Sequence, residues 1–285
     1  MASLRDIRSR IRSIRNTQKI TKAMQVVAAT RLRRAQGAVQ AARPYAEKMM
    51  EVLETTSARA SEYRHPFLER REGGRALVIL ITSDKGMAGA LNTNTLRAVN
   101  HYVRQHHRGQ AAYVCLGRKG RDFQRRLHHH VVAEATGIPD RPPIHAVLPA
   151  ITAALDEFLE GRVDVVLLAY ARWLSTLRQE PVVRPVLPLS LPEGEAQADY
   201  IYEPDPERVL DQLLPRYVES QIYQALLENQ ASEYSARMIA MQNATDAAGD
   251  MIKSLTLTAN KLRQAGITTE LMEIVGGAEA LRQSS

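Results

Sequence analysis

The chain is poor in residues on which several common classes of protein depend. Among its 285 residues there is one cysteine, Cys115. A single thiol excludes an internal disulfide framework, a cysteine-based zinc site and an internal thiol switch. Aromatic residues make up 5% of the chain, too few for an aromatic-rich β-sandwich and suited to long helices or a small α/β domain. No run approaches about 18 apolar residues, so no membrane span is predicted and we expect a soluble, cytoplasmic chain.

Acidic residues are nearly absent from residues 1–34, which carry ten Lys or Arg and one Asp. The formal net charge of the chain is +7, so a segment at +9 leaves the remainder at −2. Such a segment should meet something acidic: nucleic acid, anionic lipid or an acidic protein surface. A solvated face of a charged helix is the plainer alternative. The Arg- and Ser-rich composition also resembles a transit peptide, but the apolar repeat runs on without a break and favours a mature fold.

An apolar or small residue recurs in alternating steps of three and four from Leu4 to Leu53. This heptad spacing predicts a coiled-coil helix over residues 1–60. Pro44 lies inside it and should cost about 3 kcal/mol or kink the helix. Separate helices broken near Gly37 and Pro44 are the alternative.

A second heptad repeat runs from Leu227 to Met272 and predicts a C-terminal helix within residues 206–285. Two long helices joined by a middle domain should pair antiparallel. Polar residues interrupt both repeats, and these are Gln18, Thr21, Gln25, Gln230 and Arg237. We therefore expect a pair that is held in place partly by its surroundings.

The middle of the chain, residues 75–205, changes period. Short apolar runs at 76–82, 111–116, 131–135 and 163–170 alternate with helical stretches near 93–108, 119–127 and 144–160. This alternation predicts a central Rossmann-like α/β domain with a mostly parallel sheet. Three prolines confine residues 182–189 to an edge strand or an extended loop. The fold class is thus α/β, with a long antiparallel coiled coil of the terminal helices beside the central domain.

No local pattern in this domain indicates catalysis or a bound metal or cofactor. Residues 83–92 follow the first strand but match neither G-x-G-x-x-G nor the P-loop. A tight turn between strand and helix, or an exposed loop that touches a partner through Lys85, is the better interpretation. His128, His129 and His130 would alternate between faces of a strand, so they cannot converge on one ion. Cys115 should be a buried, inert thiol.

Several blocks together resemble the gamma subunit of F-type ATP synthases. They span nearly the whole chain, and they are residues 13–29, 81–92, 202–206, 231–238, 243–246 and 263–278. The resemblance implies a non-catalytic rotor shaft that passes torque between a proton- or sodium-driven c-ring and the catalytic beta subunits. The implied partners are a hexameric ring of alpha and beta subunits, the epsilon subunit and the c-ring. The implied location is the cytoplasmic side of a bacterial cell membrane, as a peripheral protein.

The resemblance also assigns contacts to individual residues. Contacts with beta subunits are implied for Met24, Lys85, Glu233, Arg237, Arg263, Gln264, Thr268 and Glu270. Contacts with the c-ring or epsilon are implied for Tyr200 and Glu203. No catalytic, cofactor or metal residue is implied. The cysteine-bearing insertion of chloroplast relatives is missing, so their redox regulation is not expected.

Two rival classes remain at this point. A coiled-coil nucleic-acid-binding protein would use the basic N-terminal helix, and its duplex binding would weaken steeply with salt. A Rossmann-type nucleotide enzyme would show saturable nucleotide binding by the isolated chain.

Overall fold

The computed structural model describes residues 3–59, 65–71, 73–190, 203 and 205–283. These residues form two compact units. The first comprises residues 1–27 and 239–285, and the second comprises residues 28–238. Each unit contains parts of both terminal helices, α1 (Leu4–Arg59) and α5 (Pro206–Gln283).

The second unit is built around the predicted mostly parallel sheet, whose five strands lie in the order β3-β2-β1-β4-β5. The strands are β1 (Ala76–Ile81), β2 (Ala111–Leu116), β3 (Val131–Ala135), β4 (Val165–Trp173) and β5 (Gln179–Leu187). The first four are parallel, and β5 pairs antiparallel with β4 at the edge. All six residues of β1 are buried, because helices cover both faces of a parallel sheet.

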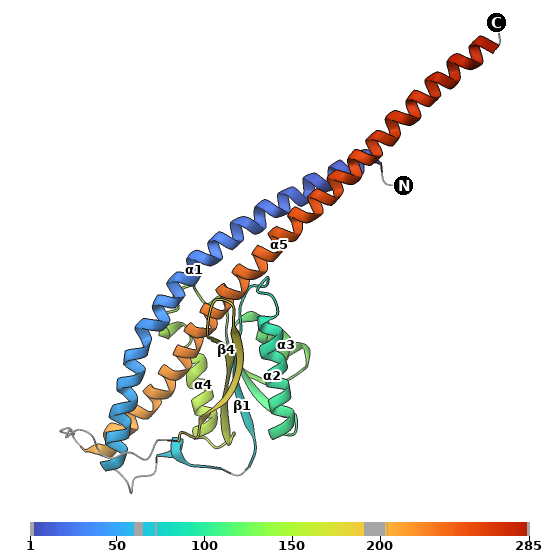
Figure 1. Cartoon of the computed structure of the whole chain (residues 1–285). Coiled ribbons are helices and arrows are strands. Elements are labelled where there is room, and N and C mark those ends of the chain that lie inside the picture. The colour runs from blue at the N-terminus through green and yellow to red at the C-terminus, as the bar shows by residue number, and fades with distance from the viewer. Residues whose placement is uncertain (1–2, 60–64, 72, 191–202, 204, 284–285) are drawn as a thin grey trace. The chain divides into compact units, whose positions relative to one another are not determined.

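Helices α2 (Leu91–His106) and α3 (Arg118–Arg126) lie on one face of this sheet, and α4 (Leu148–Leu159) lies on the other (Figure 1). Two short 3-10 turns, η1 (Pro66–Leu68) and η2 (Ile144–Ala146), complete the elements. The side chains of β1 alternate between two hydrophobic clusters. Leu77 and Ile79 join α4, whereas Val78 and Leu80 join α2.

Both terminal helices are continuous. Helix α1 runs through Gly37 and Pro44, so the alternative of separate helices is wrong. Helix α5 likewise runs through Pro215. Within the second unit, Leu53 of α1 and Leu214 of α5 are fully buried in the cluster under α4. Tertiary packing of this kind offsets the cost of a proline inside a helix.

In the first unit, α1 and α5 pair antiparallel, as predicted. Gln25 lies beside Gln242, and seven residues earlier Gln18 donates to the carbonyl of Thr245. The Thr21 and Thr245 hydroxyls are 2.7 Å apart. The polar positions of the N-terminal repeat therefore lie in the seam, where they bond across it.

The heptad prediction fails by one residue in the second half of α5. Met251 and Thr258 were expected in the seam, but both are exposed. Ile252 and Ala259 are the less exposed positions instead. The other predicted positions, Leu255 and Leu262, remain half-buried. An α-helix turns once in 3.6 residues rather than 3.5, so a strict heptad drifts around its surface, and here alternate positions of the repeat move by one residue.

Candidate functional site: the polar contact between α5 and the loop after β1

The loop after β1 is fixed by side chains that cap the next helix along the sheet. Asp84 accepts hydrogen bonds from the backbone N–H groups of Arg118 and Ile138, each at 2.9 Å. The hydroxyl of Thr82 accepts from the N–H of Gly120 at 2.8 Å. The N–H groups of Arg118 and Gly120 lie at the start of α3, and they are the donors that a bound phosphate would need. A carboxylate of the chain itself takes that position, so the loop is a structural turn.

A glycine is required beside this turn. Gly117 has φ +113°, and a Cβ atom there would lie 2.0 Å from the carbonyl oxygen of Thr82. No side chain fits at that distance, so Gly117 lets the strand and loop approach closely.

Helix α5 holds the same loop from outside through Arg237. The guanidinium of Arg237 donates to the carbonyl of Gly86 at 3.2 Å and to that of Lys85 at 3.4 Å. It also pairs with Glu233, one turn earlier, at 2.6 Å. Arg237 is 8% exposed. Burial raises the pKa of the Glu233 carboxyl above its usual range, and the charge of Arg237 opposes that shift.

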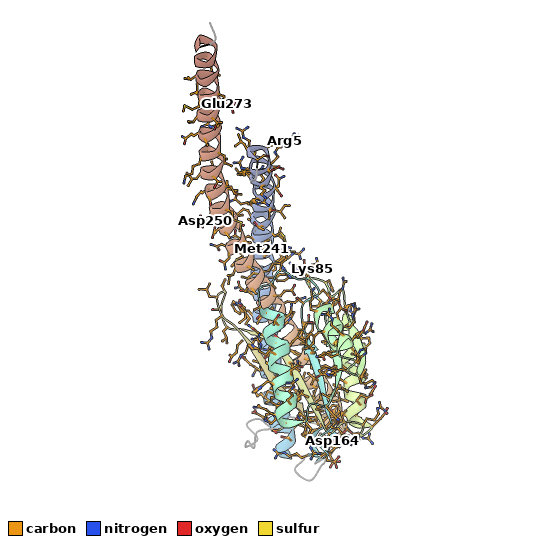
Figure 2. The ribbon with its side chains drawn as sticks, turned by 90° about the vertical axis from the view of Figure 1, so that its right-hand side faces the viewer. Arg5, Lys85, Asp164, Met241, Asp250 and Glu273 are labelled. Carbon is orange, nitrogen blue, oxygen red and sulfur yellow. The ribbon has the colours of Figure 1, made fainter. Side chains whose placement is uncertain are left out.

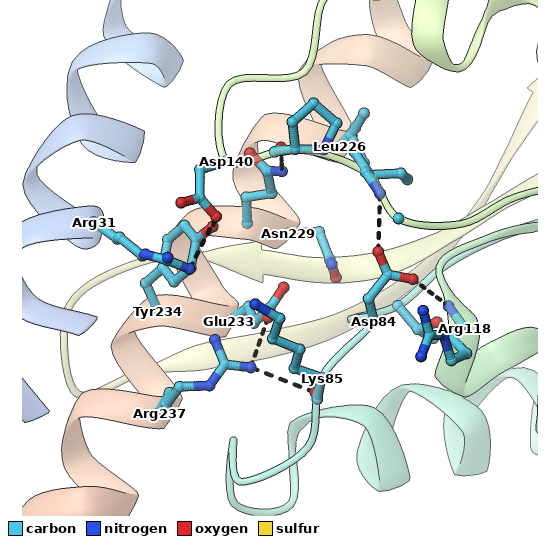
Figure 3. Close-up of a pocket in the computed structure, with 15 residues that line it drawn as sticks. Arg31, Asp84, Lys85, Arg118, Asp140, Leu226, Asn229, Glu233, Tyr234 and Arg237 are labelled. Carbon is cyan, nitrogen blue, oxygen red and sulfur yellow. Dashed lines mark hydrogen bonds and ion pairs between the residues drawn. The ribbon is translucent and has the colours of Figure 1, made fainter. Parts of the chain in front are cut away.

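A cavity of about 400 Å³ lies beside this contact and is lined by charged groups (Figure 3). On its far side, Asp140 accepts from the hydroxyl of Tyr234 at 2.7 Å and pairs with Arg31 at 3.0 Å. Burial, together with the bond to Asp140, raises the pKa of the Tyr234 hydroxyl. These bonds connect α1 and α5 with the loop after β1 and with the loop that contains Asp140. Among the described residues that line the cavity, no nucleophile is paired with a base.

The structure separates the residues that the sequence singled out. It brings together Glu233, Arg237 and the backbone of Lys85, whose own side chain is exposed. Met24 is half-buried in the first unit. Glu203 is exposed, and Tyr200 lies outside the described residues. The remaining four are all exposed along α5, and they are Arg263, Gln264, Thr268 and Glu270.

Sequence reasoning missed Asp84, Asp140 and Tyr234 as members of this polar cluster. Asp84 lies three residues after the end of the first strand, and that position could have predicted a cap on a neighbouring helix. Asp140 and Tyr234 are 94 residues apart, so nothing local in the sequence could have joined them.

Cys115 is buried, as predicted, near the C-terminal end of β2. Burial raises the pKa of its thiol to about 12, so the thiolate required for reaction is scarce at neutral pH. Among the helices that the structure describes, none is long and apolar enough to cross a membrane.

Comparison with known proteins places this chain beside one group of relatives. A family model described as ATP synthase matches residues 3–281. The chain is 47% identical to an ATP synthase gamma chain of Ralstonia nicotianae, covering 99% of this chain and 100% of the relative. It is also 47% identical to an ATP synthase gamma chain of Acidovorax, with the same coverage.

Solved structures show the same fold at lower identity. A chain of the Euglena gracilis mitochondrial ATP synthase, in a structure of OSCP, F1 and c-ring, aligns with a TM-score of 0.70 at 18% identity. That alignment covers 99% of this chain and 95% of the other. A chain from the central stalk and c-ring of the Tetrahymena thermophila enzyme aligns with a TM-score of 0.58 at 22% identity, covering 79% and 99%.

Proposed function

Because this chain belongs to the family of ATP synthase gamma chains, we propose that its paired terminal helices turn as the shaft that couples ion flow to ATP synthesis. The subunit itself is non-catalytic and belongs to the central stalk. One end of the shaft meets a c-ring, and the other stands within a ring of alpha and beta subunits. Through these contacts the chain is held at the cytoplasmic side of a bacterial membrane as a peripheral protein.

The C-terminal part of α5 carries this proposal. Every described side chain from Arg263 to Ala278 is exposed. Several of these are large apolar residues, namely Ile267, Leu271, Met272, Ile274 and Val275. Four of these residues, at positions 267, 271, 274 and 275, share one face of the helix, with Met272 at its margin. An exposed apolar face of this kind is poorly suited to water alone and well suited to contact with the inside of a protein ring.

Coupling requires that the shaft present different faces to beta subunits that are otherwise identical. Each beta subunit is then biased toward a different conformation by the contacts it makes at a given rotor angle. Arg263 and Gln264 are proposed to grip a loop of one beta subunit, followed along the helix by Thr268 and Glu270. A guanidinium offers a fork of donors, and a neighbouring amide both donates and accepts.

Met24 and Lys85 are proposed to contact the acidic helix-turn-helix segment of a beta subunit. Glu233 and Arg237 act on the same contact, because they hold the backbone of the loop that presents Lys85. At the other end, Tyr200 and Glu203 are proposed to face the c-ring and the epsilon subunit. A purified complex that contains this chain but neither ring would contradict these assignments.

The test is the double variant Arg263→Ala with Gln264→Ala in the assembled complex. A charge-assisted hydrogen bond in a shielded site is worth roughly 1.5–3 kcal/mol. If the contact forms at the rate-limiting angle, ATP turnover and ATP-driven proton pumping should fall by about one to two decades. The matched control, Arg97→Ala with Gln105→Ala, removes the same groups from exposed positions on α2 and should retain parental rates. Parental turnover in a fully assembled shaft variant would refute the proposed grip.

A further inference from the structure

A second strongly basic region lies in the central domain. Residues 91–130 contain eight Lys or Arg and one Asp, together with six of the eight histidines of the chain. The basicity of the chain is therefore not confined to residues 1–34. The rest of the chain is acidic, and the positive charge is concentrated in two separate places.

The fold brings much of this second region to one end of the sheet, the end at which the parallel strands begin. Helices α2 and α3 connect parallel strands, so both end at the edge where β2 and β3 begin. Exposed basic side chains cluster at these two helix ends and in the turns after them. We call this set the basic edge, and it comprises Arg104, His106, Arg108, Arg125, Arg126, His128 and His130. Leu127, an apolar residue that is 45% exposed, lies among them.

The charges of the basic edge are largely uncompensated within the part of the chain that the structure describes. Arg125 pairs with Glu134 at 2.8 Å. No ion pair is formed there by Arg104, Arg108 or Arg126. A helix C-terminus favours one or two cations in its last turn, which would account for Arg104 and Arg126. It does not account for Arg108 or His128, which lie beyond the helices in turns with positive φ.

The basic edge lies at the same end of the second unit as the start of α5. There, Asp211 in the first turns of α5 lies 3.8 Å from His65. Helix α5 then runs to the opposite end, where Arg237 bonds the loop at Gly86. Figure 2 shows these two ends of the unit, marked by Asp164 at the strand beginnings and Lys85 at the strand ends. Glu203 directly precedes α5, so it belongs to the end that carries the basic edge.

We propose that the basic edge binds the anionic headgroups of the phospholipid bilayer that surrounds the c-ring. The inference rests on the proposed function for its direction, because Glu203 is proposed to face the ring and therefore the membrane. Arginines suit phosphate groups, to which the guanidinium donates two parallel hydrogen bonds. Headgroups in a fluid bilayer exchange freely, so this attraction holds the domain near the surface without fixing a rotor angle.

The first measurement locates the contact on the full chain. Leu127→Cys is labelled with an environment-sensitive dye, and the matched control is Leu177→Cys, an 82% exposed leucine in the β4–β5 turn at the opposite end. The buried Cys115 does not compete for the label. Vesicles of phosphatidylcholine alone are compared with vesicles that contain phosphatidylglycerol. We expect a blue shift at position 127 with the anionic vesicles only, and no shift at position 177.

The second measurement removes the charge. Each Lys or Arg near an anionic surface contributes a roughly fivefold change in affinity. Replacing Arg104, Arg108, Arg125 and Arg126 by Gln should therefore weaken binding to phosphatidylglycerol vesicles at least tenfold. The matched control replaces Arg5, Arg8, Arg12 and Arg15 of α1, which are equally exposed and equally numerous. It should leave the dye shift at position 127 in place.

Three results would overturn the proposal. They are equal shifts at positions 127 and 177, unchanged vesicle affinity of the edge variant, and loss of another subunit from a complex that carries the edge variant. The last would identify the basic edge as a protein interface. Failure of the parental chain to assemble with alpha and beta subunits would instead contradict the proposed function.

Discussion

The same two helices are held in different ways in the two units. In the second unit, the buried positions of α1 include Leu32, Val39 and Leu53, all 5% exposed or less. In the first unit, the seam passes through Gln18, Thr21 and Gln25, which bond polar groups of α5. Apolar burial is worth about 25 cal/mol per Å², whereas a hydrogen bond that replaces one to water adds only about 1 kcal/mol. In the second unit Leu32 and Val39 pack against α5, and Leu53 packs into the cluster under α4. The difference teaches that apolar packing secures the two helices in the second unit, whereas polar bonds across the seam contribute more in the first.

Truncating one leucine in each unit should give the largest contrast. Leu53→Ala removes a fully buried side chain from the second unit and should lower its free energy of unfolding by about 3 kcal/mol. Leu255→Ala, at a half-buried seam position of the first unit, should cost about 1 kcal/mol or less. Urea unfolding followed by the fluorescence of Trp173, the single tryptophan of the chain, reports on the second unit.

The fluorescence transition should therefore move for Leu53→Ala and stay in place for Leu255→Ala. An equal shift of that transition in both variants would mean that the two units unfold as one body, which would remove the contrast between them.

A smaller effect should come from the ion pair between Arg75 and Asp164, which lies where β1 and β4 begin. Asp164, 4% exposed, accepts bonds from the backbone N–H of Arg75 at 2.8 Å and from its guanidinium at 2.8 and 3.0 Å. Arg75 holds the pKa of the Asp164 carboxyl below its usual range. A depressed pKa stabilises the fold at pH values above the unfolded pKa, and this stabilisation is lost as the pH falls through the folded pKa.

Asp164→Asn should accordingly destabilise the second unit by about 1–2 kcal/mol at neutral pH, a value reduced because the Arg75 side chain is half exposed. The difference between parent and variant should shrink below about pH 4, where the parental carboxyl begins to protonate. Urea unfolding between pH 3 and pH 8 measures it, and a difference that grows toward low pH would reverse the sign of our argument.

Much of this fold could be predicted because its signals are local. The apolar runs of the middle domain predicted the first four strands, and the three prolines near residue 185 left an edge strand or an extended loop, of which the structure shows the edge strand β5. The slip at Met251 could not be predicted, because the heptad rule carries no information about where a straight helix drifts away from its partner.

Less of the candidate site could be predicted from the sequence. The resemblance implied a beta-subunit contact for Arg237, but nothing in the sequence predicted that it bonds a loop about 150 residues earlier in the chain. Contacts between residues so far apart depend on how the sheet and α5 come together, which no spacing rule encodes. The basic edge, by contrast, was present in the composition of residues 91–130 and was overshadowed by the stronger charge of residues 1–34.

Hydrogen exchange on the isolated full chain tests the contrast between the units most directly. Protection follows the free energy of local opening, which ranges from near zero to the full stability of the protein. The account predicts that residues 4–27 and 239–283 exchange at least a hundredfold faster than β1, and that both become protected in the assembled complex. Protection of these segments equal to that of β1 in the isolated chain would show that the terminal helices hold each other without help, and would contradict the account.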